Sequence, residues 1–96
     1  SVGFGLTLNN LTPELARRLR VPDDVTGAVV TNVERRSAAA RAGVRPGDII
    51  MQVNRTPVQS ALDTGEKLEE VPIGQAAFVL VWRRGQEVFL TIPREE

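Results

Sequence analysis

The residues whose types and spacing could bind a ligand stand at the beginning of the chain, where Gly3-Phe4-Gly5-Leu6 runs into Thr7-Leu8. Two glycines around one large apolar residue allow several backbone amides to point toward one place, and such a nest binds an anion, most naturally a carboxylate. Phe4, Leu6 and Leu8 share one face of the strand expected to follow, which would place the anion beside an apolar pocket. A carboxylate next to an apolar side chain describes a peptide C-terminus, so the motif predicts a binding function.

The composition excludes most catalytic chemistry. A length of 96 residues with 42% hydrophobic content fits one compact domain, residues 1–96. The absence of cysteine and histidine removes disulfides, thiolate nucleophiles and the commonest general base and metal ligand. A net charge of zero provides no field to attract nucleic acid, and no apolar run approaches the roughly 18 residues that span a bilayer. We therefore expect a non-catalytic domain with no cofactor, no metal, no nucleic-acid partner and no membrane insertion.

The first half of the chain predicts strands and short helices in alternation. Thr12-Pro13-Glu14 is typical of a helix start, and this helix should end near Arg20. The β-branched residues of 28–33 predict a strand, expected in the interior of the sheet. Ser37 can cap a two-turn helix of alanines that ends at Gly43, because glycine accepts the left-handed conformation.

The second half predicts a strand, a longer helix and a closing hairpin. Arg45-Pro46-Gly47-Asp48 predicts a tight turn that leads into a strand over Ile49–Asn54. Ser60 is a capping residue for a helix from about Ala61 to Val71. Gly65 inside that helix costs about 1 kcal/mol relative to alanine, which suggests a compensating role. The hairpin strands are expected at Ala77–Trp82 and Glu87–Ile92.

This order of elements, together with its motifs, resembles a PDZ domain. The most specific stretch is Ser37–Ile50; with Gly3–Leu6 and Val53–Val58 it is similar to the circularly permuted PDZ domains of bacterial Do-like (HtrA) serine proteases. Leu8–Leu15 further resembles the second of the two PDZ domains in such proteases. The resemblance implies an α+β fold, a small and partly open antiparallel β-barrel or sandwich capped by two helices.

The resemblance also implies which residues form the site. In that family, loop amides hold the terminal carboxylate of a peptide, and the last peptide residues add as a strand between the first strand and the longer helix. By motif position, the carboxylate-binding amides would be those of Phe4, Gly5 and Leu6. The peptide groove would comprise Thr7, Leu8, Ala61, Thr64, Gly65 and Leu68, with Phe4, Leu6 and Leu8 as the pocket floor and Thr64 near the edge.

The chain departs from the usual PDZ motif in two ways. The loop reads Gly-Phe-Gly-Leu rather than Gly-Leu-Gly-Phe, which exchanges the large groups across the pocket. Ala61 stands where some PDZ domains have a groove histidine, and a preference for apolar ligand residues follows as a hypothesis. A purely structural interpretation is also open, in which Phe4, Leu6 and Leu8 belong to an edge strand that closes the core.

The implied function is capture of hydrophobic C-terminal segments of unfolded or misassembled polypeptides by strand addition, which would regulate or feed a linked protease. The parent would be a periplasmic, trypsin-like serine protease, oligomeric although the isolated domain is monomeric. One alternative is a PDZ domain with an unused groove that assembles protease oligomers. Another is a PDZ module of a different processing protease.

Overall fold

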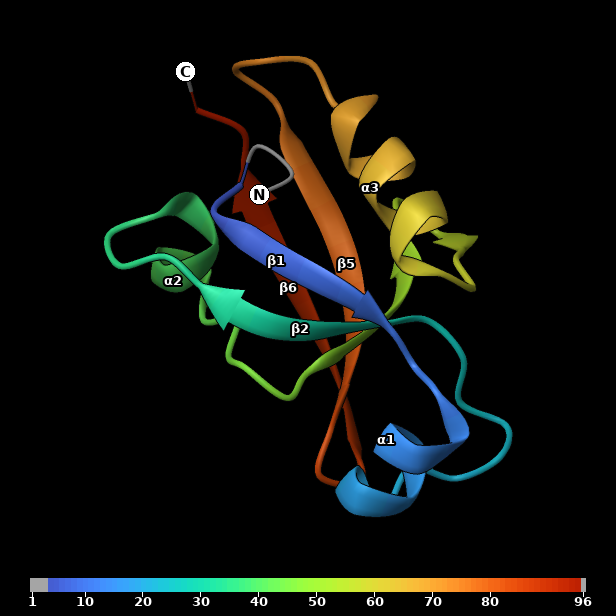
Figure 1. Ribbon diagram of the computed structural model, residues 1–96. Helices are drawn as coiled ribbons and strands as arrows, with labels where there is room; N and C mark the ends of the chain where they lie inside the picture. The colour runs from blue at the N-terminus through green and yellow to red at the C-terminus, as the bar shows by residue number, and fades with distance from the viewer. Residues whose placement is uncertain (1–3, 96) are drawn as a thin grey trace.

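The computed structural model describes residues 4–95, and Gly3, the first glycine of the loop motif, lies outside them. Within these residues the chain forms one six-stranded antiparallel sheet and three helices (Figure 1). The strands are β1 (Leu6–Asn10), β2 (Ala28–Val33), β3 (Ile49–Val53), β4 (Thr56–Pro57), β5 (Ala76–Arg83) and β6 (Gln86–Pro93). The helices are α1 (Pro13–Leu19), α2 (Ala38–Ala42) and α3 (Ala61–Glu69).

All three helices begin at the side-chain caps that the sequence predicts. Thr12, Ser37 and Ser60 each accept a hydrogen bond from the backbone amide three residues further on, at 3.0–3.1 Å. α3 ends at Glu69 rather than near Val71. The reason is local, because Val71 precedes a proline and that position disfavours helical backbone angles. Within the described chain, no helix is long and apolar enough to cross a bilayer.

The sheet has the strand order β1-β2-β3-β5-β6, with β4 paired to β3 beside this path. β2 therefore lies in the interior, as predicted. β1 and β6 are the two ends of the path, so the sheet is open and does not close into a barrel. α2 and α3 cover the face of the sheet that carries the main core, as the predicted cap of two helices implies, and α1 packs on the opposite face.

The closing hairpin is longer than its sequence signal. β5 and β6 pair from Ala76 opposite Pro93 to Arg83 opposite Gln86. Only Arg84 and Gly85 connect them, with φ values of 48° and 88°. Two consecutive positive φ angles are typical of the turn whose twist matches that of the flanking strands, so pairing continues up to the turn itself.

Two hydrophobic clusters occupy opposite faces of the sheet. Ile50 belongs to the main core, which also contains Leu68 of α3 and Ala39 of α2. Its neighbour Ile49 belongs to the second cluster with Trp82, and consecutive strand residues point to opposite faces. The residues of the first helix region that pack on this second cluster are Leu11, Leu15, Ala16 and Leu19. Figure 1 accordingly shows α1 separated from α2 and α3.

Candidate functional site

Two consecutive peptide groups of the loop before β1 turn their amides away from the neighbouring elements. The Phe4 carbonyl accepts a hydrogen bond from the Ala39 amide at 3.2 Å, and the Gly5 carbonyl accepts one from the Glu34 amide at 2.8 Å. No peptide bond among the described residues is cis. In a trans peptide the N–H of the next residue points opposite to the carbonyl. The amides of Gly5 and Leu6 therefore point away from α2 and from the end of β2.

Gly5 holds this loop against the start of α2. Its φ is 84°, a left-handed conformation that glycine adopts without a steric penalty. A Cβ atom at this position would lie 2.2 Å from the Cβ of Ser37, the residue that caps α2. Both the backbone angle and the space require glycine here, and together they set the direction of the two amides.

Phe4 lies in the main core and not at the ligand surface. Its side chain is 2% exposed, and the Arg94 guanidinium lies over its ring at 6.0 Å from the centroid. The predicted Phe4 amide belongs to the peptide group shared with Gly3, which lies outside the described residues. The loop thus presents the amides of Gly5 and Leu6, while the Phe4 side chain anchors it.

The outer edge of β1 continues the row of outward amides. β1 pairs with β2 on one side and, within residues 4–95, with no strand on the other. The Thr7 carbonyl accepts a hydrogen bond from the Thr31 hydroxyl of β2 at 3.2 Å. By the same trans-peptide geometry, the Leu8 amide points to the free edge. A free edge with unpaired amides is a template for a further strand.

α3 lies alongside this edge and runs antiparallel to β1. At one end, the Ala61 amide donates to the side-chain oxygen of Asn10 at 2.7 Å. At the other end, Arg94, which covers Phe4, donates to the Glu69 carbonyl at 2.7 Å. The C-terminal end of α3 is therefore beside the loop that presents the Gly5 and Leu6 amides.

An open cavity of about 510 Å³ lies between β1 and α3. We call it the β1–α3 groove; its lining residues are Leu6, Thr7, Leu8, Ala61, Leu62, Gly65, Glu66 and Glu69. Four of the six predicted groove residues therefore line one cavity, together with Leu6 of the predicted pocket floor; the four are Thr7, Leu8, Ala61 and Gly65. A strand added to the β1 edge would lie in this groove with its end at the loop.

Two predicted groove residues lie behind this lining. Thr64 and Leu68 are fully buried and are not among the residues that line the groove. The Thr64 hydroxyl donates to the Ser60 carbonyl at 2.7 Å, and Leu68 joins the main core. Both residues lie one turn apart on the side of α3 that faces the sheet.

The residues that sequence reasoning missed are Leu62, Glu66 and Glu69. Leu62 and Glu69 stand three and four positions from Gly65, a helix residue predicted to line the groove, and Glu66 stands four positions from Leu62. Residues at this spacing are neighbours on a helix surface, so the spacing was the available signal. The carboxylates of Glu66 and Glu69 thus line a groove that was predicted to favour apolar ligand residues.

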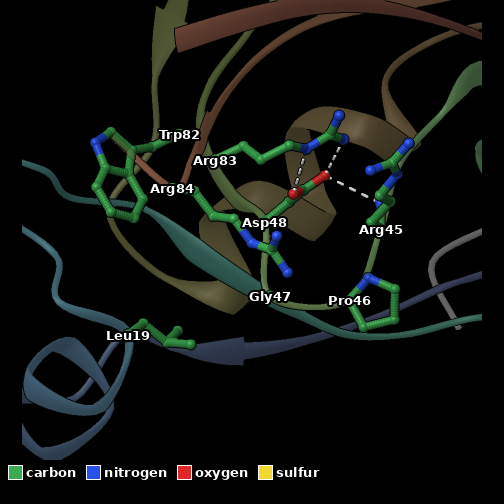
Figure 2. A pocket seen from close by; sticks show the side chains of 8 residues that line it. All are labelled: Leu19, Arg45, Pro46, Gly47, Asp48, Trp82, Arg83 and Arg84. Atoms are coloured by element: carbon green, nitrogen blue, oxygen red, sulfur yellow. Dashed lines mark hydrogen bonds and ion pairs between the residues drawn. The ribbon is translucent and has the colours of Figure 1, made fainter. Parts of the chain in front are cut away.

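A second hollow, of about 200 Å³, lies away from the groove and is built around a buried ion pair (Figure 2). Asp48 is 2% exposed, and its two carboxylate oxygens accept from Arg83 Nε at 2.8 Å and from Arg83 Nη2 at 2.6 Å. The Arg45 amide donates to the same carboxylate at 3.0 Å. The hydrogen bond that Arg83 donates to Asp48 raises the pKa of Arg83 above its ordinary value.

This hollow has a structural role that its contacts explain. Arg83 also donates to the Gly43 carbonyl at 2.7 Å, so one guanidinium joins the end of α2, the turn before β3 and the end of β5. The charged groups at its centre are already paired with one another. Among the described residues, no group of three or more carboxylates is placed to hold a metal ion.

The fold and the groove define the class of this protein. The family model of the PDZ domain matches residues 29–83, more than half of the chain, so the chain belongs to the PDZ domain family. It is similar over 91 residues, at 36% identity, to HhoB of Synechocystis sp., a protein named for serine protease activity; the match covers 88% of this chain and 22% of HhoB. A DegP-like protein of Chlamydia trachomatis, named as a periplasmic serine endoprotease, is 33% identical over 97% of this chain and 18% of its own length. The chain thus spans about a fifth of these relatives.

Solved structures show the same relationship. The HtrA-type protease AlgW in complex with a decapeptide matches with a TM-score of 0.82 and 33% identity, over 94% of this chain and 27% of AlgW. The PDZ domain of HtrA3, bound to a phage-derived ligand, matches with a TM-score of 0.79 and 24% identity, over 94% of this chain and 81% of that domain. The HtrA3 match shows the shared fold. The AlgW match shows that this chain is similar in sequence and structure to part of an HtrA-type protease.

Proposed function

We propose that this domain captures the apolar C-terminus of a polypeptide by strand addition to the free edge of β1. The observation that carries the proposal is the direction of three amides. Those of Gly5, Leu6 and Leu8 point to one edge, which faces the β1–α3 groove. The first two would hold the terminal carboxylate, and the third would begin the ladder with the added strand. The Phe4 amide remains part of the proposed carboxylate site.

The expected affinity is modest. Burial of one apolar terminal side chain contributes about 1.5–3 kcal/mol. A few strand hydrogen bonds add about 1 kcal/mol each. After the cost of association is subtracted, such contacts correspond to a Kd of about micromolar or weaker. This suits a module that holds a substrate briefly.

The wider role follows from the relatives. Their names describe serine proteases, and the DegP-like protein is named as periplasmic. The chain contains no histidine and no cysteine, and the proposed role of the domain is to regulate or feed a linked, trypsin-like protease in the periplasm. As part of the same proposal, the isolated domain is monomeric, the parent is oligomeric, and this is the second PDZ copy.

The test is a titration of the domain with the peptide acetyl-Ala-Ala-Gln-Ala-Val, once with a free C-terminal carboxylate and once with a C-terminal amide. Binding is monitored through the NMR shifts of the backbone amides of the domain. The free carboxylate should give saturable shifts at Gly5, Leu6 and Leu8. The amide-ended peptide should bind at least tenfold more weakly, because it lacks the charge that the loop amides stabilise.

Equal binding of the two peptides would overturn the carboxylate site while leaving strand addition possible. An absence of shifts with both, and with a series of apolar end residues, would overturn the proposal. It would favour the alternative in which the groove is unused and the domain contacts other subunits of its parent.

A further inference from the structure

We propose that two copies of this domain associate weakly, face to face, through an exposed aromatic pair on the β5–β6 hairpin. The pair is Phe78 and Phe89, whose rings stack with centroids 5.0 Å apart and planes 6° from parallel. Phe78 is 37% exposed and Phe89 is 58% exposed. The other two aromatic residues of the chain, Phe4 and Trp82, are buried. Half of the aromatic residues thus form one apolar surface, which we call the Phe78–Phe89 patch.

The patch lies on the face of the sheet on which α1 packs. Ala77 and Val79, the neighbours of Phe78 in β5, belong to the main core, so Phe78 points to the opposite face. On that face α1 covers Trp82 at the turn end of the hairpin (Figure 1). Neither ring of the patch is part of the two hydrophobic clusters, and neither lines the β1–α3 groove. Among the described residues, the patch is therefore an uncovered part of the sheet, separate from the proposed peptide site.

A positive and a negative side chain stand at opposite ends of the patch. Arg55 and Phe78 line the same open hollow of about 320 Å³, and the preceding Asn54 accepts a hydrogen bond from the Phe78 amide at 2.9 Å. Glu87 stands two positions before Phe89 in β6, so their side chains share one face. The β5–β6 register places Glu87 further from Phe78 than Phe89 is. The order across the sheet is thus Arg55, Phe78, Phe89, Glu87.

This order makes the patch complementary to a second copy of itself. Arg55 and Glu87 are exposed, and neither has a salt-bridge partner among residues 4–95. A twofold contact brings the same surface of both copies together. If the second copy runs in the reverse order, Arg55 of each copy meets Glu87 of the other, and the aromatic pairs lie on each other. The other twofold arrangement sets each residue on itself and is disfavoured, because it brings like charges together.

The size of the patch predicts a weak dimer. The exposed fractions of Phe78 and Phe89 together amount to about one phenylalanine side chain, or about 200 Å². Stable interfaces bury about 800 Å² on each partner. We therefore expect a dimer Kd of about 0.1–1 mM, which leaves the domain monomeric at micromolar concentrations. In the oligomeric parent proposed above, linked copies reach such effective concentrations.

The test is sedimentation equilibrium of the domain at low salt, from about 20 µM to about 1 mM, which spans the expected Kd. The average mass should rise with concentration from that of a monomer toward that of a dimer. Phe89→Ser should weaken the dimer at least about tenfold, because the symmetric contact loses one ring from each copy. Phe89 is exposed, so the core stays intact in this variant, which urea unfolding verifies.

The relative orientation of the two copies is tested by exchange of the two charges. Arg55→Glu and Glu87→Arg, each alone, should weaken the dimer at least about threefold, because each places like charges together. The double variant should restore the original Kd. Arg35→Glu, an equal charge change at an exposed residue before α2, is the control and should leave the dimer Kd unchanged.

A domain that stays monomeric over the whole concentration range overturns the inference and leaves the patch to a partner of different sequence. A dimer that is unaffected by Phe89→Ser, or that the double charge variant does not restore, overturns it as well. The proposed peptide capture is tested separately, because the patch lies outside the β1–α3 groove. Peptide titration of Phe89→Ser should therefore match that of the unchanged domain.

Discussion

Gly5 illustrates how one residue can determine the geometry of a binding loop. Its positive φ turns the chain, and its missing side chain lets the loop touch the residue that caps α2. The Phe4 and Gly5 carbonyls accept hydrogen bonds from the Ala39 and Glu34 amides. The Gly5 and Leu6 amides, which belong to the same two peptide groups, therefore face outward. The anion site is therefore a consequence of close packing on the far side of the loop.

We expect Gly5→Ala to destabilise the domain by about 2–4 kcal/mol, because the left-handed strain is added to a clash with Ser37. Gly85→Ala is the matched control, since its φ of 88° is similar and a Cβ there would meet nothing within 4 Å. That variant should lose only about 1 kcal/mol. Urea unfolding of both variants measures the difference, and equal losses would contradict the steric argument.

At the scale of elements, the Asp48–Arg83 pair connects the end of α2, the turn before β3 and the end of β5. The hollow around this pair shares no lining residue with the β1–α3 groove. Because the Asp48 carboxylate is buried, its negative charge has to be compensated by hydrogen-bond donors. These are the Arg83 guanidinium at the end of β5 and the Arg45 amide in the turn before β3.

Arg83→Met should lower the free energy of unfolding by about 3 kcal/mol, because a buried carboxylate loses its charge partner. Asp48→Asn combined with Arg83→Met should recover part of this loss. Glu14→Gln, which removes the exposed Glu14–Arg18 pair at 3.7 Å, should change stability by less than about 1 kcal/mol. An equal effect of Arg83→Met and Glu14→Gln in urea unfolding would refute the structural role.

The pH dependence of the Asp48–Arg83 pair follows from the direction of the shift. The pKa of Arg83 is raised in the folded state, so its stabilisation is complete below the unfolded-state pKa and is lost only as pH rises through the higher folded value. Both lie in the strongly alkaline range. Titration of Arg83 should therefore cause no loss of stability between about pH 6 and 10.

At the scale of the whole molecule, the two ends of the described chain meet beside the groove (Figure 1). Arg94 follows β6, yet it covers Phe4 and donates to the Glu69 and Val71 carbonyls, both at 2.7 Å. One side chain thus joins the loop before β1, the end of α3 and the last strand. The junction therefore connects the C-terminal end of α3 to the loop that presents the Gly5 and Leu6 amides.

Arg94→Met should reduce stability by about 1–3 kcal/mol, because two carbonyl hydrogen bonds and the contact with Phe4 are lost. The substitution should also weaken the binding of peptides that end in a free carboxylate, since α3 would be held less firmly beside the loop. Arg84→Met in the exposed hairpin turn is the control and should change neither property appreciably. Unchanged unfolding and peptide titration curves for Arg94→Met would show that the junction is dispensable.

Most elements could be predicted from the sequence because their signals are local. Thr12, Ser37 and Ser60 cap helices through bonds to residues three positions away, and Gly43 ends α2 in a left-handed conformation. The strand of 28–33 and its interior position were also predicted correctly. Errors arose at boundaries, where α3 stops before a proline and the hairpin pairs up to its two-residue turn.

By itself, the sequence determined the helix caps, the turns, the strand segments and the loop motif, because these depend on backbone preferences and hydrogen bonds between near neighbours. Only the tertiary structure decided that Asp48 meets Arg83, that Arg94 covers Phe4, and that Glu66 and Glu69 border the groove while Thr64 and Leu68 face the core. These relationships join residues far apart in the chain or depend on how α3 is rotated against β1. The physical reason is that side-chain partners across a fold are chosen by packing of whole elements, which no short window of residues contains.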